Sequence, residues 1–432
     1  MDKIIIDGGK PLRGVVPIGG AKNATLPILV ATLVAPGEHR LARVPDLADV
    51  GSMLSLLGRI GCPSLGHAGL VSVDTTRVIY NEAPYDLVRK MRASVLALGP
   101  LLARCGEAHV SLPGGCAIGV RPIDQHLKGL EALGCQFELS GGYVHGKVDQ
   151  LKGGHVRFDM PTVTGTENVL MAAVLAQGES VFENAAREPE IVDLVRFLRS
   201  LGAIIEGEGT STLHVQGVAS LTPAKAPYGI LPDRVEAGTY LVAGAITGGD
   251  ITIQGVNPGD LSAVLDALLS AGCTIDVGDD TVRVRREGPV RTVNVTTEPH
   301  PGFPTDMQAQ LMALLCLAQG ESEIRETIFE NRFMHVPELQ RLGANIDVFG
   351  NLARTKGVRQ LTGATVMATD LRASASLVLA GLAARGRTEV LRLYHLDRGY
   401  ERLVEKLQAV GAQVARVGDD PRERAGQPGA AA

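Results

Sequence analysis

One cysteine lies within a glycine-rich segment, Gly114-Gly115-Cys116-Ala117-Ile118-Gly119, and Arg121 follows closely. Three glycines in six residues predict a mobile loop. A nearby guanidinium lowers the pKa of a thiol, and the thiolate is the reactive form of cysteine. Cys116 is therefore a candidate reactive residue. The other cysteines follow a glycine at an expected helix end or stand in apolar helical stretches, where we expect buried, inert thiols: Cys62, Cys105, Cys135, Cys273 and Cys316.

Positively charged residues stand near the start of several expected helices. Lys22 follows Gly19 and Gly20 at the beginning of an apolar stretch, and Arg92 and Arg372 lie in the first turns of two others. Positive charge at a helix N-terminus opposes the helix dipole, whereas the free backbone N–H groups there favour a bound anion. We therefore interpret these cations as anion-binding residues. A solvated side chain is the alternative, and it is the more ordinary interpretation of Lys22 taken alone.

Two aspartates and two further arginines belong to the same polar set. Asp306 and Asp370 stand before Ala- and Leu-rich helical runs, where an aspartate normally caps the helix. Arg332 and Arg398 lie in polar connections ahead of later helices, where surface ion pairs are the alternative. The chain carries a net charge of -5, so cations gathered in one cleft would suit a small polyanion rather than a polymer.

These residues are embedded in a sixfold repeat with a period of about 70 residues. In each copy a helical stretch ends at a glycine and an alternating strand pattern follows, at Gly61, Gly134, Gly202, Gly272, Gly343 and Gly411. A second, Ala- and Leu-rich helix ends at a glycine just before a strand, at Gly37, Gly106, Gly178, Gly249, Gly320 and Gly386. We expect these glycines to be left-handed C-caps. The chain is predicted to hold six α/β subdomains in two domains of three, and a repeat scaffold without chemistry is the alternative.

Composition excludes several classes of function. Aromatic residues make up 3% of the chain and Trp is absent, which argues against a surface that stacks single-stranded nucleic acid. We find neither a block of five like charges nor a signal peptide, and apolar runs such as 26–35 are too short to cross a bilayer. We therefore expect a cytoplasmic protein with reduced cysteines. Residues 419–432 lack apolar periodicity and are predicted to be a disordered tail.

Several collinear segments resemble the enolpyruvyl transferase family, and within it the branch that uses UDP-N-acetylglucosamine. The match runs from Ile4 to about Val417 and includes residues 19–23, 91–94, 113–119, 121–124, 183–190, 304–310, 329–333 and 370–373. The resemblance implies a two-domain inside-out α/β barrel, with three β/α subunits per domain, helices inside, sheets outside, and helix N-termini facing an interdomain cleft. On this pattern residues 22–230 form the domain with the cysteine-bearing loop, and residues 1–21 plus 231–418 form the second.

The resemblance also implies a reaction. The enolpyruvyl group of phosphoenolpyruvate would pass to the 3′-hydroxyl of UDP-N-acetylglucosamine with release of phosphate, the first committed step of peptidoglycan precursor synthesis. Cys116 would protonate C3, bond covalently to phosphoenolpyruvate and be the target of fosfomycin. Asp306 would be the base at the hydroxyl. Lys22, Arg121 and Arg398 would bind the phosphate and carboxylate of phosphoenolpyruvate.

The family positions that hold the nucleotide sugar or line the cleft match Asn23, Arg92, Arg121, Pro122, Ile123, Asp124, Gln125, Val163, Thr164, Gly165, Ile328, Arg332, Asp370 and Arg372. Two departures stand out, because residues 160–165 lack a lysine that some members carry and Gln125 stands where some members have leucine.

The resemblance implies small-molecule substrates and neither a metal nor a cofactor. We expect no nucleic acid and no membrane as partners, and protein partners stay open. The alternatives are the shikimate-pathway enolpyruvyl transferase, which lacks the cysteine-bearing loop, and a non-catalytic nucleotide-sugar-binding module.

Overall fold

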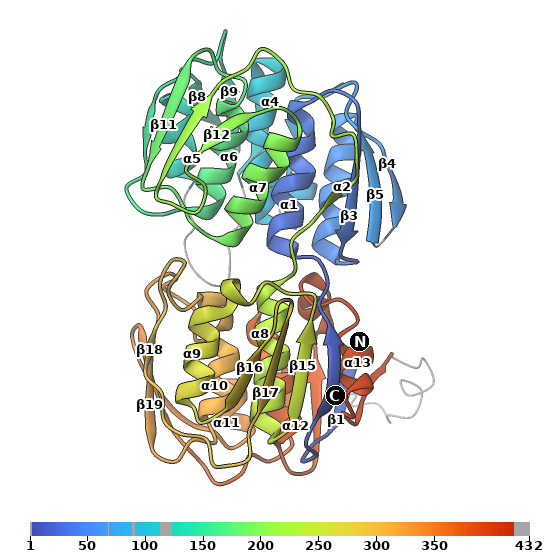
Figure 1. Ribbon diagram of the computed structural model, residues 1–432, viewed down its shortest axis with the longest axis vertical. Helices are drawn as coiled ribbons and strands as arrows, with labels where there is room; N and C mark the ends of the chain where they lie inside the picture. The colour runs from blue at the N-terminus through green and yellow to red at the C-terminus, as the bar shows by residue number, and fades with distance from the viewer. Residues whose placement is uncertain (1, 68, 89–90, 113–122, 419–432) are drawn as a thin grey trace, which may run out of the picture. The chain divides into compact units, whose positions relative to one another are not determined.

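The computed structural model describes residues 2–67, 69–88, 91–112 and 123–418 (Figure 1). By its internal contacts the chain divides into two compact units, each with its own hydrophobic core. The described residues of unit 1 fall within Met1–Ile18, Val235–Thr297 and Phe303–Ala432. Unit 2 contains those within Gly19–Arg234 and the short segment Glu298–Gly302. The sequence-based boundaries at 21/22 and 230/231 lie a few residues from these divisions.

The described strands form six four-stranded sheets of one design. In each sheet the first two strands are parallel and the next two pairings are antiparallel. The three sheets of unit 2 are, in order, β14 (Tyr228–Gly229), β3 (Glu38–Val44), β5 (Gly69–Asp74), β4 (Ser64–His67); β6 (Glu82–Ala83), β7 (Glu107–Ser111), β9 (Tyr143–Lys147), β8 (Gln136–Ser140); and β10 (His155–Arg157), β11 (Glu179–Glu183), β13 (Thr212–Gln216), β12 (Ile204–Glu206).

Unit 1 repeats this design but takes two strands from the start of the chain. Its sheets are β2 (Arg13–Pro17), β15 (Asp250–Gln254), β17 (Thr281–Arg285), β16 (Thr274–Val277); β18 (Val295–Thr296), β19 (Glu321–Arg325), β21 (Leu352–Lys356), β20 (Asn345–Phe349); and β22 (Thr365–Met367), β23 (Arg387–Leu391), β1 (Lys3–Asp7), β24 (Val414–Val417). Lys3 of β1 pairs with Leu391 of β23 and with Val417 of β24, so the first strand of the chain lies between two strands from its last part in the third sheet.

One helix of each repeat is buried almost all round, which is typical of a helix inside a core. In unit 2 these are α1 (Lys22–Ala31) with η1 (Thr32–Val34), α4 (Leu98–Cys105) after η2 (Arg92–Ala97), and α6 (Val163–Ala173). In unit 1 they are α8 (Arg234–Thr247), α10 (Gln308–Leu315) after η4 (Thr305–Met307), and α12 (Ala373–Ala383). Every residue of α10 is buried, and every residue of α1 except Asn23. The helices therefore form the inside of each unit, as expected.

The other helices are amphipathic or short. They are α2 (Ala48–Ile60), α3 (Tyr85–Val88), α5 (Asp124–Glu131), α7 (Pro189–Ser200), α9 (Ser262–Ser270) after η3 (Pro258–Leu261), α11 (Val336–Arg341), and α13 (Leu403–Ala409) after η5 (Leu393–Arg398). Helix α7 buries Ile191, Leu194, Val195 and Leu198, the i, i+3, i+4, i+7 spacing of one helical face. No helix in the described part of the chain is long and apolar enough to cross a membrane.

The six glycines of the first repeat marker all have φ between 90° and 106°, so their predicted positive φ is confirmed. The predicted C-cap position is confirmed for Gly61 and Gly106, which cap α2 and α4. It is wrong for Gly134 and Gly386, because α5 and α12 are capped by Ala132 and Ala384.

In the fourth repeat the predicted conformation of the second marker is also wrong. There Gly248, with φ 65°, takes the left-handed conformation, and Gly249 does not. A Cβ atom on Gly249 would lie 2.1 Å from the carbonyl oxygen of Leu12, so close backbone approach is what requires glycine at this position.

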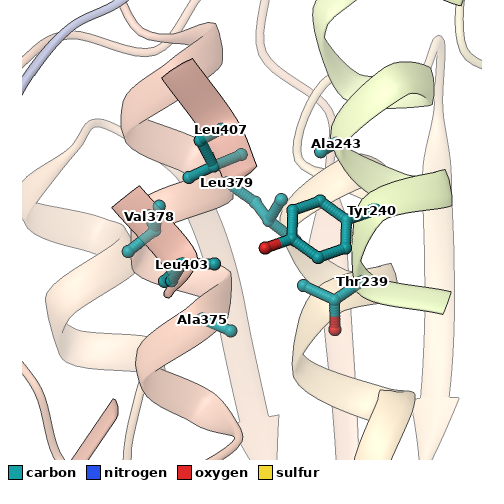
Figure 2. Close-up of a pocket in the computed structure, with 8 residues that line it drawn as sticks. All are labelled: Thr239, Tyr240, Ala243, Ala375, Val378, Leu379, Leu403 and Leu407. Atoms are coloured by element: carbon teal, nitrogen blue, oxygen red, sulfur yellow. The ribbon is translucent and has the colours of Figure 1, made fainter. Parts of the chain in front are cut away.

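A small apolar pocket lies inside unit 1 among α8, α12 and α13 (Figure 2). Figure 2 shows the ring of Tyr240 reaching from α8 toward leucines of the other two helices. Burial raises the pKa of Tyr240 well above its ordinary value, and its hydroxyl has no hydrogen-bond partner among the described residues. The pocket is part of the helical core and does not contain the residues that the sequence analysis selected.

Candidate active site

Lys22 is the first residue of α1 and is paired with an aspartate that the sequence analysis did not select. Its Nζ lies 3.2 Å from Oδ2 of Asp49, in the first turn of α2, and the two side chains are 10% and 4% exposed. The backbone N–H of Lys22 donates to Oδ2 of Asp233 over 3.4 Å. The solvated-lysine interpretation is therefore wrong, because two carboxylates hold this residue at the helix start.

The start of α5 is tied to the segment that leads into α6. Gln125, which is 9% exposed, donates from Nε2 to Oδ2 of Asp159 over 2.9 Å and accepts the backbone N–H of Asp159 at Oε1, also over 2.9 Å. Hydrogen bonds from Lys128 and Gln125 hold the pKa of Asp159 below its ordinary value. The glutamine that departs from the family pattern thus ties the start of α5 to Asp159, which precedes the predicted nucleotide-sugar segment 163–165.

Thr164 is held by a buried histidine that the sequence analysis missed. The ring of His126 contacts Thr164 Oγ1 at 3.1 Å through Nε2 and Asn168 Nδ2 at 2.9 Å through Nδ1. Asn168 in turn accepts the backbone N–H of Gly99 over 2.7 Å, so its amide nitrogen faces the ring and Nδ1 of His126 is the acceptor. Burial and, secondly, the charge of Arg92 lower the pKa of His126 to about 3. His126 is therefore a neutral donor to Thr164.

This histidine predicts a specific pH dependence of stability. Because its pKa in the folded protein lies below the unfolded value, the unfolded state gains a proton first as pH falls from about 6.5, and stability is lost. The wild-type protein loses this stability as pH falls, whereas the His126→Gln variant does not. The difference in unfolding free energy between wild type and variant should therefore narrow by about 3 kcal/mol between pH 7 and pH 4.5. Urea unfolding at several pH values measures the gap.

The matched control is His214→Gln, because His214 is an exposed histidine with a side chain 50% accessible. The narrowing found for His126→Gln should exceed any change in the gap found for His214→Gln. His335, whose pKa burial lowers to about 4, titrates in all three proteins and cancels from the comparison. A gap for His126→Gln that is constant from pH 7 to pH 4.5 would contradict the assignment of a neutral, buried imidazole.

In unit 1, Asp306 lies between two arginines. Its Oδ1 is 2.8 Å from Arg332 and its Oδ2 is 3.4 Å from Arg372. The arginine side chains are 6% and 3% exposed, whereas the aspartate is 26% exposed. Arg332 also stacks 5.2 Å from the ring centroid of Phe329. A carboxylate that is partly open to solvent and fixed by two buried cations is an oriented acceptor for a proton or a hydroxyl group.

Arg372 is itself fixed by neighbouring groups. It donates from Nη1 to the carbonyl oxygen of Gly399 over 3.2 Å, and its guanidinium lies 5.4 Å from the ring centroid of Tyr400. The hydroxyl of Tyr400 contacts Gln310 Nε2 at 3.2 Å, and the same amide donates to the carbonyl oxygen of Asp306 over 2.8 Å. A buried polar set therefore holds both partners of one ion pair.

The capping interpretation is confirmed for one aspartate and wrong for the other. Oδ1 of Asp370 accepts the backbone N–H groups of Arg372 and Ala373, both over 2.9 Å, at the start of α12. Asp306 lies inside η4, where the N-cap residue is Pro304, and the N-cap residue of the following helix α10 is Met307. Arg332 is buried, so the surface-ion-pair interpretation of this residue is also wrong.

The selected residues fall into two sets, one in each unit. Unit 2 holds Lys22, Asn23, Arg92, Ile123, Asp124, Gln125, Val163, Thr164 and Gly165, while unit 1 holds Asp306, Ile328, Arg332, Asp370, Arg372 and Arg398. Within each set the residues lie at or near helix starts or in the connections before helices. Cys116, Arg121, Pro122 and the predicted tail lie outside the described residues. Within the described residues, no group of three or more His, Cys, Asp or Glu side chains is arranged to hold a metal ion.

Four of the five remaining cysteines are buried, and burial raises the pKa of each thiol. The pKa is raised to about 11 for Cys62 and Cys273, and to about 12 for Cys135 and Cys316. The prediction of a buried thiol is wrong for Cys105, which is exposed because it ends α4. Its pKa is also raised, chiefly by desolvation, so none of these five thiols is activated.

Comparison with known proteins agrees with this architecture. Residues 6–407 match the family model described as EPSP synthase (3-phosphoshikimate 1-carboxyvinyltransferase). Proteins named UDP-N-acetylglucosamine 1-carboxyvinyltransferase are 57% identical in Anaeromyxobacter dehalogenans (strain 2CP-C), covering 96% of this chain and 100% of the relative, and 58% identical in Myxococcus xanthus (strain DK1622), covering 96% and 99%.

Among solved structures, the enolpyruvyl transferase NikO from Streptomyces tendae is 28% identical, with a TM-score of 0.86 over 96% of this chain and 98% of that one. The EPSP synthase from Acinetobacter baumannii has the same fold at 17% identity, with a TM-score of 0.74 over 97% and 100%. These likenesses confirm the predicted two-domain inside-out fold. The chain belongs to the EPSP synthase family.

Proposed function

We propose that this protein is an enzyme that transfers the enolpyruvyl group of phosphoenolpyruvate to the 3′-hydroxyl of UDP-N-acetylglucosamine and releases phosphate. The observation that carries the proposal is 57% identity, over 96% of the chain, to a relative whose name states this carboxyvinyl transfer. The reaction supplies the first committed precursor of peptidoglycan, and we place it in the cytoplasm. Both substrates are small molecules that carry phosphate, which suits cations held at helix starts.

The addition step needs a base at the hydroxyl and an acid at C3. We assign the base to Asp306, since its carboxylate is partly open to solvent and oriented by Arg332 and Arg372. The oxygen then bonds to C2 of phosphoenolpyruvate while Cys116 gives a proton to C3. In the second step C3 loses a proton to the Cys116 thiolate and the C2–O bond to phosphate breaks. The phosphate leaves with the proton that Asp306 had taken, and the enolpyruvyl ether remains.

Anion binding is assigned to fixed cations. Lys22, held by Asp49 at the start of α1, together with Arg121 and Arg398, would bind phosphoenolpyruvate. Preorganised cations aimed at developing negative charge contribute roughly 3 kcal/mol each to transition-state stabilisation. The ion pair with Asp49 supports this role because it holds the ammonium group in one place before any ligand binds.

The nucleotide sugar is assigned to both sets of residues. Asn23, Arg92, the segment 121–125 and the segment 163–165 would hold it from unit 2. Ile328, Arg332, Asp370 and Arg372 would line its site from unit 1. The contacts of Gln125 with Asp159 and of His126 with Thr164 support a preformed arrangement of the unit 2 segments.

The test is phosphate release from phosphoenolpyruvate by the full chain, with no acceptor, with UDP-N-acetylglucosamine, and with shikimate 3-phosphate. We expect release only with the nucleotide sugar. Release only with shikimate 3-phosphate would show that this compound is the acceptor and would favour the shikimate-pathway activity of the same family. Binding of the nucleotide sugar by folded protein without phosphate release would instead support a non-catalytic module.

A further inference from the structure

Glu326 is a buried carboxylate that the proposed chemistry does not use. It follows strand β19 directly and is 2% exposed. Its Oε1 accepts hydrogen bonds from Thr297 Oγ1 over 2.9 Å, from the backbone N–H of Ile328 over 2.8 Å and from that of Phe329 over 3.2 Å. Its Oε2 accepts from Thr305 Oγ1 over 2.8 Å. All four donors are hydroxyl or backbone N–H groups.

Burying a carboxylate is costly unless its oxygens are hydrogen-bonded, so a group with four donors is fixed in position. The donors come from three separate parts of unit 1. Thr297 ends the segment before the chain crosses to unit 2, Thr305 begins η4, and Ile328 and Phe329 form the connection after β19. Glu326 therefore joins segments that the sequence separates.

Two of these contacts lead to residues with a proposed role. Thr305 precedes Asp306, the proposed base, and Ile328 is a proposed contact of the nucleotide sugar. Thr297 strengthens the same junction, because its Oγ1 also accepts the backbone N–H of Thr327 over 2.9 Å. One carboxylate thus sets the position of the base and of a segment expected to hold the acceptor.

We infer that Glu326 is a positioning residue that fixes Asp306 relative to the acceptor hydroxyl, an inference that rests on the proposed function. A misplacement of about 1 Å costs on the order of a hundredfold in rate. Glu326 therefore affects the rate of the reaction although it does not touch substrate. Thr305 transmits the effect to Asp306, and the backbone of Ile328 transmits it to the nucleotide-sugar site.

The test compares four variants with the wild-type full chain, using phosphate release for kcat and KM and counting nucleotide-sugar sites by calorimetry. Glu326→Ala should lower kcat per site roughly a hundredfold and raise KM for UDP-N-acetylglucosamine roughly tenfold, because it frees both segments. Thr305→Val should lower kcat per site roughly tenfold with an unchanged KM, because it cuts only the link to the base.

The conservative variants should restore kcat per site and KM to values close to those of wild type. Glu326→Gln keeps one oxygen for Thr297, Ile328 and Phe329, and its amide nitrogen faces a threonine hydroxyl, which can also accept. Thr305→Ser keeps the hydroxyl. Both variants should have kcat per site and KM values within about threefold of wild type. The control is Thr388→Val in β23, which removes a buried hydroxyl that has no hydrogen-bond partner among the described residues.

A purely structural role would lower the number of binding sites and the melting temperature but leave kcat per site and KM unchanged. That result for Glu326→Ala and Thr305→Val would overturn the inference. If Glu326→Ala does not fold, Thr305→Val and its serine rescue decide the question. Wild-type protein that releases no phosphate with the nucleotide sugar would overturn the proposed function itself, which separates the two failures.

Discussion

Replacing Asp306 with asparagine is expected to lower phosphate release by about a thousandfold, since a positioned general base typically contributes between a hundredfold and ten-thousandfold. Asparagine keeps the shape of the side chain and one oxygen for Arg332, which lies 2.8 Å from the carboxylate. It cannot accept a proton from the 3′-hydroxyl. Calorimetry should therefore find UDP-N-acetylglucosamine bound within a few-fold of wild type, while the rate with phosphoenolpyruvate collapses.

Asp250→Asn is the matched control for this variant. Asp250 has a side chain 28% exposed, against 26% for Asp306, and it also pairs with an arginine, 2.6 Å from Arg283 across strands β15 and β17. Loss of that ion pair should leave turnover unchanged. If Asp306→Asn turned over at a near-normal rate while Asp250→Asn did so too, the assignment of Asp306 as the base would be lost.

Asp49→Asn is expected to destabilise unit 2 by about 3 kcal/mol, because it removes one charge of a buried ion pair, the carboxylate that lies 3.2 Å from the ammonium group of Lys22. The two side chains are 10% and 4% exposed, so solvent provides little screening. The ammonium group of Lys22 also loses the contact with Asp49 that helps to fix its position, and KM for phosphoenolpyruvate should rise. Urea unfolding gives the change in stability, and phosphate release at varied phosphoenolpyruvate gives the change in KM.

A similar buried pair in unit 1 supplies the comparison. Lys406 and Glu236 are 2.6 Å apart with side chains 15% and 4% exposed. Glu236→Gln should cost a comparable amount of stability without changing KM for phosphoenolpyruvate. Equal KM values in the two variants would remove Lys22 from the proposed phosphoenolpyruvate site and leave it as a structural ion pair.

The repeat architecture was predictable because local chemistry specifies it. Gly61 ends helix α2 with a positive φ, which only glycine adopts cheaply, and the corresponding glycines of the other copies have a positive φ as well. The conformation of Gly249 was not predictable, because glycine is required there by the close approach of Leu12, a residue far away in the sequence. Local sequence signals therefore located the helices and strands, whereas contacts between distant segments could not be predicted from them.

The same distinction applies to the candidate site. Charged residues at helix starts were found from the sequence because they violate the helix-dipole rule. Asp49 was missed because an aspartate in the first turn of α2 satisfies that rule and looks ordinary. Glu326 was missed because its donors come from Thr297 and Thr305 as well as from its own connection. The groups that hold functional residues are specified by tertiary packing.

The first strand of the chain has a consequence for synthesis. Strand β1 lies between β23 and β24, with Lys3 opposite Leu391 and Val417, so its partners leave the ribosome last. At about 5–20 residues per second, the nascent N-terminus waits tens of seconds or more for them. Unit 2, which is nearly continuous in sequence, has all its strands once residue 234 has emerged. Its folding can precede that of unit 1, while β1 stays without its sheet partners until β23 and β24 have been synthesised.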